Sequence, residues 1–157
     1  MKKFTKEEIE GTRDYFKKKG FEEVEVTLGE RNFSYFVLPQ SLAPDLPDFA
    51  NRCSGEPSDG YVLGVSDSID ERFRQYVAAH EFIEFTEIGM DVEHRCAGAL
   101  EEELQLVPLE IKDEYVEMRT KFFRNLIEYC SKQPDSYTPA DISEFKQSLN
   151  SLEQAAN

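Results

Sequence analysis

The sequence predicts an α+β fold, in which a small antiparallel sheet in the N-terminal part is followed by a mainly helical C-terminal part. Before residue 66, apolar and polar residues alternate in two runs, 21–28 and 33–38, as in half-buried strands. After residue 67, apolar residues recur at spacings of three and four, which is typical of amphipathic helices. The 157 residues and the 39% hydrophobic content suit a single domain, 1–157, with a helix and the strands in 1–66 and helices in 67–151.

The first 38 residues are expected to form a helix and a hairpin. Thr5 is a good N-cap residue, and Gly20 is a typical residue just beyond a helix end, so a helix is predicted between them. The two alternating runs that follow are separated by the turn-rich segment 29–32. This pattern predicts an antiparallel hairpin.

Residues 40–60 contain three of the seven prolines, which predicts a long surface loop with one short helical turn. A short strand is expected over 61–66, followed directly by a helix over 68–88 that Asp67 or Ser68 could cap.

Three more helices are expected in the C-terminal part. The first ends near Leu106, the second covers 109–131, and the third begins near Thr138 and Pro139, with Ser136 or Thr138 as its candidate cap. The apolar stripe of the second helix is interpreted as core, with a partner interface as the alternative.

The charge balance limits the classes of partner. Eighteen basic and 32 acidic residues give a net charge of -14, which disfavours nucleic acid and favours metal ions and basic proteins. The three cysteines, Cys53, Cys96 and Cys130, have no C-x-x-C spacing and cannot all pair, so a reducing compartment is expected. With neither an apolar secretory segment at the start nor a run of membrane-spanning length, the prediction is a cytoplasmic protein without a membrane partner.

The helix that follows the last strand carries ionisable residues among apolar ones. His80, Glu84 and Glu87 lie at positions i, i+4 and i+7 and therefore share one face, while Glu81 points about a quarter turn away. The second histidine, His94, follows shortly after the expected helix end. Carboxylates in such apolar surroundings have raised pKa values or bind a cation, so the helix is a candidate site for metal binding or proton transfer.

The segment His80-Glu81-x-x-Glu84 resembles the H-E-x-x-H helix of the zincin metallopeptidases, with glutamate in the second ligand position. The resemblance implies a zincin-like fold in which His80 and Glu84 hold a divalent metal and Glu81 acts as general base. In the gluzincin branch a third ligand, a glutamate, comes from the next helix, and Glu102 and Glu103 lie near that distance. Glu87 and His94 are further candidate ligands.

The sequence also departs from the zincin pattern. Glu84 supplies a carboxylate oxygen where zincins have a histidine nitrogen, and oxygen is the chemically harder ligand. Zinc is therefore the first expectation, but manganese and iron are alternatives. His94 does not have the metzincin spacing. In zincins the edge strand before the active helix lines the substrate cleft, as residues 60–66 could do here. Taken alone, the run 101–103 is expected to form an exposed charged face.

Two classes of function remain open. The first is a metal-dependent, peptidase-like hydrolase that acts on a peptide or protein, or an inactive relative that keeps the scaffold for binding. The second is an acidic, non-enzymatic module that blocks a basic protein, as immunity proteins do, in which His80 is an ordinary core or boundary histidine. A nucleophilic pair of Cys96 and His94 is disfavoured, because an i, i+2 separation points the two side chains apart. The sequence does not predict the oligomeric state.

Overall fold

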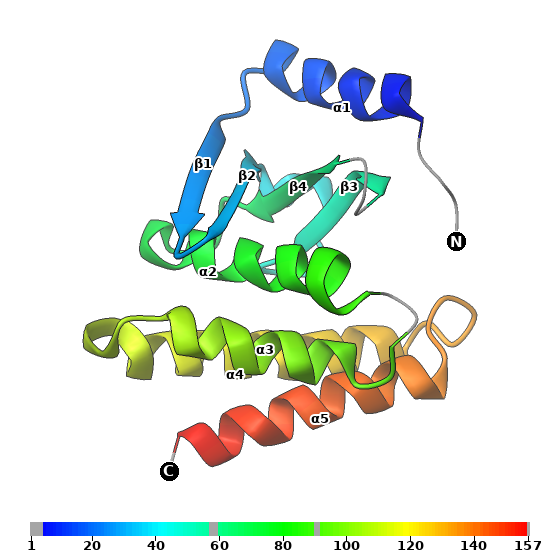
Figure 1. The fold of residues 1–157 in the computed structure, drawn as a ribbon. Coiled ribbons are helices and arrows are strands. Elements are labelled where there is room, and N and C mark those ends of the chain that lie inside the picture. Colours follow the sequence, from blue (N-terminus) through cyan, green and yellow to red (C-terminus); the bar gives the residue numbers. More distant parts are fainter. Residues whose placement is uncertain (1–4, 57–59, 90–91, 157) are drawn as a thin grey trace.

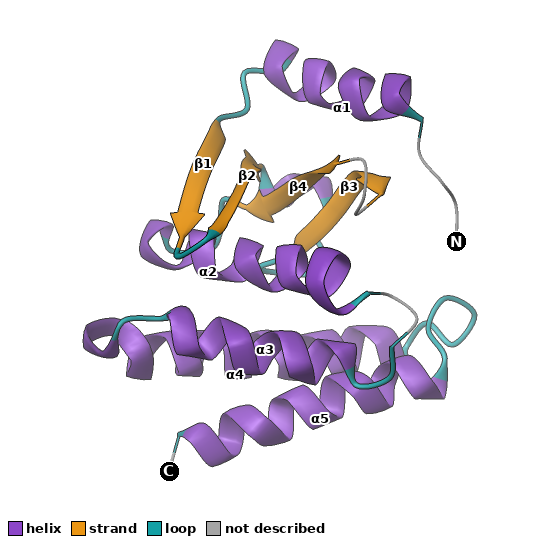
Figure 2. Ribbon diagram, viewed as in Figure 1, coloured by secondary structure: helices purple, strands orange, loops and turns teal. Residues whose placement is uncertain are grey.

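The computed structural model describes residues 5–56, 60–89 and 92–156, and it has the predicted α+β architecture (Figures 1 and 2). The elements in chain order are α1 (Lys6–Lys18), β1 (Glu23–Leu28), β2 (Arg31–Leu38), η1 (Gln40–Leu42), β3 (Ala50–Glu56), β4 (Gly60–Ser66), α2 (Glu71–Phe82), the π-helical η2 (Ile83–Ile88), α3 (Arg95–Leu106), η3 (Leu109–Ile111), α4 (Lys112–Ser131) and α5 (Pro139–Ala155).

The molecule is built in layers (Figure 1). Helix α1 covers one face of the sheet and α2 covers the other, while α3, α4 and α5 lie beyond α2. All strands of the described residues precede residue 67, as predicted. No helix among the described residues is long and apolar enough to cross a membrane.

The sheet has the order β1-β2-β4-β3 and is mixed rather than purely antiparallel. The predicted hairpin is confirmed, since β1 pairs with β2 through a turn that sets Leu28 opposite Arg31. Strand β4 pairs with β2 in parallel and with β3 in antiparallel orientation. The expectation that 60–66 form an edge strand is therefore wrong, because β4 has neighbours on both sides and β3 occupies the edge.

The prediction of a loop over 40–60 is only partly correct. The short helical turn is present as η1, but the second half of the stretch contains strand β3. Its pairing with β4 shifts register between Arg52 and Ser54. Polar, glycine-containing β3 lacks an alternating pattern, and it is held by hydrogen bonds to a neighbouring strand rather than by local propensity.

Helix α2 begins later than predicted. Its N-cap is Asp70, whose carboxylate accepts a hydrogen bond from the Arg72 backbone N–H at 3.0 Å. Ser68 instead bonds the Asp48 carboxylate at 2.7 Å. The predicted caps Thr5 and Thr138 both form reciprocal capping boxes at the starts of α1 and α5.

The core consists of three apolar clusters, between α1 and the sheet, between the sheet and α2, and among α3, α4 and α5. The predicted stripe of α4 is buried, with Tyr115 fully enclosed and Phe122 and Leu126 nearly so. This packing holds the C-terminal end of α2 against α3 and α4, where the ionisable residues meet.

Candidate metal centre

His80 lies in the last turn of α2 and is only 3% exposed. Its Nδ1 is 2.7 Å from Glu103 Oε1, and its Nε2 is 3.0 Å from Glu84 Oε2. Both ring nitrogens therefore face carboxylates: Nδ1 faces Glu103 of α3, and Nε2 faces Glu84 of η2.

A thiol completes the cluster. Cys96, in the first turn of α3, places its Sγ 3.7 Å from His80 Nε2. The Ser148 hydroxyl of α5 donates to the same sulfur at 3.1 Å. One donor atom each from His80, Glu84 and Cys96 lie within 4.8 Å of one another. An imidazole, a carboxylate and a thiol are all zinc ligands.

Glu103 is completely buried and is held by two residues of α4. Arg119 Nη2 donates to Glu103 Oε1 at 3.1 Å, Arg119 Nε lies 2.9 Å from Oε2, and the Tyr115 hydroxyl donates to Oε2. Burial would raise the pKa of Glu103, but the charge of Arg119 and the hydrogen bonds lower it. Glu103 is therefore an anion that accepts a hydrogen bond from His80 Nδ1–H.

The Glu103 contact determines which His80 nitrogen can bind a metal. With Nδ1–H bonded to a carboxylate, Nε2 is the nitrogen that faces Glu84 and Cys96. Burial disfavours the imidazolium, yet the hydrogen bonds to Cys96, Glu103 and Glu84 raise the pKa of His80 well above 6.5. A metal would thus replace a proton on Nε2.

Glu84 is shared between His80 and a second cation. Its Oε1 lies 3.3 Å from Arg95 Nε at the start of α3. Burial would raise the pKa of Glu84, but the contacts with His80 and Arg95 lower it. Glu84 is therefore ionised, and Arg95 occupies one of its two oxygens.

Glu81 lies beside this cluster, in a cavity of about 210 Å³ that His80, Glu84 and Cys96 also line. The Glu81 carboxylate forms no hydrogen bond or ion pair with the residues that the structure describes. Burial and the neighbouring Glu84 charge raise its pKa to about 8. Asn51 and Arg119 are the other polar residues that line the cavity, and the remaining lining is apolar or aromatic: Leu46, Ala50, Phe122, Phe123, Leu126, Tyr137 and Phe145.

Three predicted ligands lie outside the cluster. Glu87 and Glu102 both contact Arg31 of β2, with distances of 2.6 Å and 3.5 Å to their nearest oxygens. The π-helical turn of η2 changes the rotation per residue, so Glu87 no longer shares the face of His80. His94 is exposed, and its Nδ1 is 2.8 Å from Gln147 Oε1.

The run 101–103 is only partly exposed, contrary to the expectation for a run of charges. Glu101 and Glu102 face solvent, whereas Glu103 is buried and joins His80. The resemblance to zincins makes Glu103 a candidate metal ligand, and this stays a prediction. In the structure, the Glu103 carboxylate faces Nδ1 of His80 and not the Nε2 side of the ring.

Several residues of the cluster were not among the predicted site residues. In the sequence, Cys96 is the cysteine nearest to the candidate ligands but is not predicted as a ligand itself, and Tyr115 belongs to the predicted core stripe. The available signal was the spacing of Tyr115 and Arg119, four residues apart, which places a charge within the apolar face of α4. Nothing in the sequence near Ser148 indicates its contact with Cys96.

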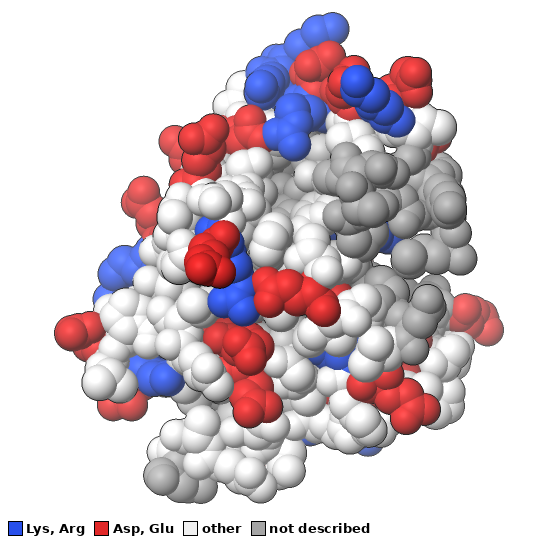
Figure 3. Space-filling view, in the orientation of Figure 1, with Lys and Arg blue, Asp and Glu red and all other residues white. Residues whose placement is uncertain are grey.

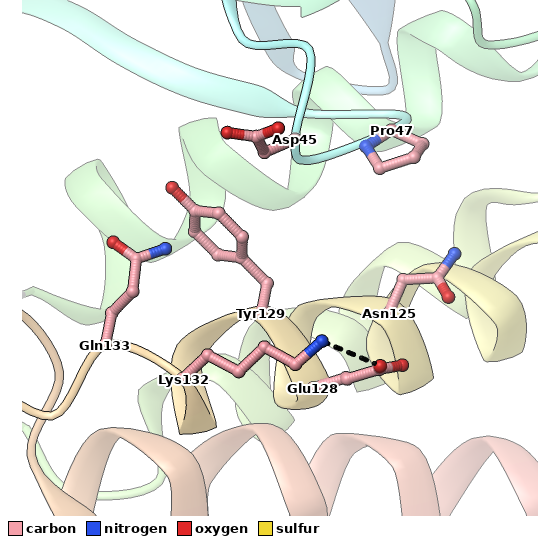
Figure 4. A pocket seen from close by; sticks show the side chains of 7 residues that line it. All are labelled: Asp45, Pro47, Asn125, Glu128, Tyr129, Lys132 and Gln133. Atoms are coloured by element: carbon pink, nitrogen blue, oxygen red, sulfur yellow. Dashed lines mark hydrogen bonds and ion pairs between the residues drawn. The ribbon is translucent and has the colours of Figure 1, made fainter.

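A larger cleft of about 490 Å³ lies between the loop before β3 and the C-terminal end of α4 (Figure 4). Asp45 and Tyr129 lie on opposite sides of this cleft, and Lys132 is paired with Glu128 at 3.2 Å. Its charged side chains are exposed. The cleft therefore offers less distinctive chemistry than the buried cluster.

Comparison with known proteins adds no further constraint on this centre. No protein-family model, curated protein or solved structure matches the chain at a significant level.

Proposed function

We propose that this protein binds a divalent metal ion, zinc in the first place, through His80 Nε2, a Glu84 oxygen and the Cys96 thiolate. The observation that carries the proposal is the convergence of these three donors at the wall of one cavity. Glu103 would orient the imidazole from its other side, as carboxylates commonly do for metal-binding histidines.

The spacing of the donors supports this assignment. Two ligand atoms about 2.1 Å from one tetrahedral ion lie roughly 3.4 Å apart, and slightly further apart when one is sulfur. The distances from His80 Nε2 are 3.0 Å to Glu84 Oε2 and 3.7 Å to Cys96 Sγ. Small side-chain movements would therefore suffice. A thiolate in the set favours zinc over manganese, while iron remains an alternative.

Three protein ligands leave a fourth position for water or substrate, which is typical of catalytic zinc sites. We therefore propose hydrolysis, with a peptide or protein as substrate, as the activity of the site. A divalent ion there would supply Lewis-acid chemistry. Glu81 would accept a proton from the attacking water, because it lines the same cavity as the three donors and forms no hydrogen bond or ion pair with the described residues. The cytoplasm is the proposed compartment, since Cys53, Cys96 and Cys130 are free thiols.

Elemental analysis of protein purified without chelators tests metal binding. The expected result is about one zinc per chain for the native protein, and none for His80→Ala and Cys96→Ala. His94→Ala is the matched control, because it removes the other, exposed imidazole and should keep the metal. Equal metal content in all four proteins would refute the proposed ligands.

Activity is tested separately with a fluorogenic peptide library. Glu81→Gln should retain the metal and lose cleavage, while Glu101→Gln, an exposed isosteric change, should keep both. Metal-loaded native protein without cleavage would limit the proposal to metal binding. Cleavage that survives in Glu81→Gln would remove Glu81 from the general-base role.

A further inference from the structure

A second feature lies on another side of the molecule, at the free edge of β1. A groove of about 440 Å³ runs between this strand and the first turns of α2. The groove is lined by Glu22, Glu23, Val24, Glu25, Val26, Tyr35, Glu71, Arg74 and Gln75. On the face shown in Figure 3, acidic side chains gather along the β1 side of the sheet.

The backbone of β1 is available for pairing at this groove. Glu22 O accepts a hydrogen bond from Val37 N at 2.9 Å, so these two residues form a hydrogen-bonded pair of the hairpin. Such pairs alternate with non-hydrogen-bonded positions along antiparallel strands. Glu23, Glu25 and Thr27 therefore direct their N–H and C=O groups away from β2. Within the described residues, no backbone hydrogen bond reaches these groups.

The side chains around this edge carry an excess of negative charge. Glu22, Glu25 and Glu71 form no hydrogen bond or ion pair with any residue that the structure describes. Arg74 also lines the groove, but its guanidinium donates to the backbone carbonyls of Ile69 and Asp67, at 2.8 Å and 3.0 Å. The carboxylates of the groove therefore outnumber its cations.

The hydroxyl of a largely buried tyrosine also faces the groove without a protein partner in the described part of the chain. Tyr35 of β2 is only 4% exposed and lines the groove, and its hydroxyl has no hydrogen-bond partner among the described residues. Burial raises the pKa of Tyr35, the Arg74 charge lowers it, and the charges of Glu22 and Glu71 raise it further, so the phenol lies near one cation and two carboxylates. The hydroxyl can donate to a ligand that enters the groove.

We propose that the β1 edge binds an extended, lysine- or arginine-rich segment of another protein, which adds a strand to the sheet beside Glu25 and Thr27. Strand addition uses the unpaired backbone groups for affinity, and alternate side chains for specificity. Side chains alternate along a strand, so Glu22 lies on the α2 face of the sheet together with Glu71, whereas Glu25 lies on the opposite face. Basic side chains at alternate positions of the added strand would meet Glu22 and Glu71. A second copy of this chain is a poor occupant, since pairing two β1 edges would oppose like charges.

The proposal is independent of the metal centre, and it gives the acidic-module class of function a defined surface. Its test uses a fluorescent eight-residue peptide of alternating lysine and valine, with alternating glutamate and valine as the matched probe. Fluorescence anisotropy gives the dissociation constants, and hydrogen exchange of the metal-free native protein locates the binding edge. We expect binding of the lysine peptide only, with slower exchange at the Glu25 and Thr27 amides.

Charge-reversal variants complete the test. The double change Glu22→Lys with Glu71→Lys should weaken peptide binding about tenfold or more. Glu101→Lys with Glu110→Lys alters the net charge equally at exposed sites outside the groove and should leave binding nearly unchanged. Equal weakening by both pairs, unprotected amides at Glu25 and Thr27, or no binding of the lysine peptide would each overturn the proposal.

Discussion

At the scale of single residues, His80 is the group around which the others are arranged. It contacts two carboxylates and one thiol, and it is enclosed by the packing of α2 against α3 and α4. Its neighbours Glu84 and Glu103 remain ionised because His80, Arg95 and Arg119 surround them. The cluster is thus balanced between buried charges of both signs, and its stability should depend on pH.

The first prediction concerns the metal-free protein between pH 6 and 9. Because the folded-state pKa of His80 is raised, its stabilising contribution is complete below about 6.5 and is lost as the pH rises through the higher folded value. Ionisation of Glu81 opposes folding between its ordinary value of 4.5 and about 8. Both effects predict that the free energy of unfolding falls as the pH rises.

Urea denaturation at several pH values measures this slope. Glu81→Gln should make it shallower, because glutamine has no proton to lose. Glu101→Gln, at an exposed position, should leave it unchanged. A stability that rises between pH 6 and 9 would contradict the assigned directions. On the acid side, the lowered pKa values of Glu84 and Glu103 predict a loss of stability as the pH falls below about 4.5.

The second prediction concerns Arg95, whose Nε lies 3.3 Å from Glu84 Oε1. This cation competes with a metal for the same carboxylate, so Arg95→Ala should increase zinc affinity, by up to about fivefold for one partly exposed ion pair. Competition with a chromogenic chelator gives the affinity. Arg124→Ala is the control, since Arg124 pairs with Glu153 at the surface. Weaker zinc binding by Arg95→Ala would show that Arg95 supports the site instead.

At the scale of elements, the site depends on how η2 ends the helix begun by α2. The π-helical turn keeps Glu84 next to His80 and turns Glu87 toward Arg31. Such single π-helical turns often occur at functional sites. Helix α5 contributes from the opposite side, because Ser148 bonds Cys96. Loosening α5 should therefore affect the site without touching a proposed ligand.

The third prediction tests this dependence through the cap of α5. Thr138→Ala removes the side-chain oxygen that accepts the Asp141 N–H, which should cost about 1 kcal/mol of unfolding free energy. The reactivity of the Cys96 thiol toward a maleimide should increase as α5 frays. Ser143→Ala, an exposed change within the same helix, should alter neither quantity measurably. If the reactivity of the Cys96 thiol is unchanged in Thr138→Ala, the packing of α5 does not control access to the site.

The sequence predicted those elements whose signals are local. The caps Thr5 and Thr138 and the hairpin turn are encoded within a few residues of one another, and all three are present. Strand β3 was missed because its hydrogen bonds depend on β4. Glu103 was assigned to an exposed run because its burial depends on Arg119, a residue of another helix. Contacts between distant segments, which decide both cases, leave little trace in local pattern.

At the scale of the whole molecule, the buried charges connect three helices beneath the sheet. His80 belongs to α2, Glu103 to α3 and Arg119 to α4, so this one network spans the layers seen in Figure 1. A buried network of this kind is sensitive to the loss of one member, because the remaining charges lose their partners.

The fourth prediction is that Glu103→Ala destabilises the protein by about 3–5 kcal/mol, since it leaves Arg119 and His80 buried without their shared carboxylate. Adding Arg119→Met should recover much of this loss, because an apolar pair replaces the orphaned cation. Chemical denaturation measures both. Equal destabilisation in the single and double variants would show that packing, rather than unpaired charge, dominates the cost.

The most direct test of the central claim is X-ray absorption at the zinc edge of the zinc-loaded protein. The proposed ligands His80, Glu84 and Cys96 predict one sulfur at about 2.3 Å, with nitrogen and oxygen ligands at about 2.0–2.2 Å. The sulfur contribution should disappear in Cys96→Ser and persist in Cys130→Ser, which changes a buried thiol outside the cluster. A zinc site without sulfur in the native protein, or sulfur ligation that survives in Cys96→Ser, would contradict the proposed metal centre.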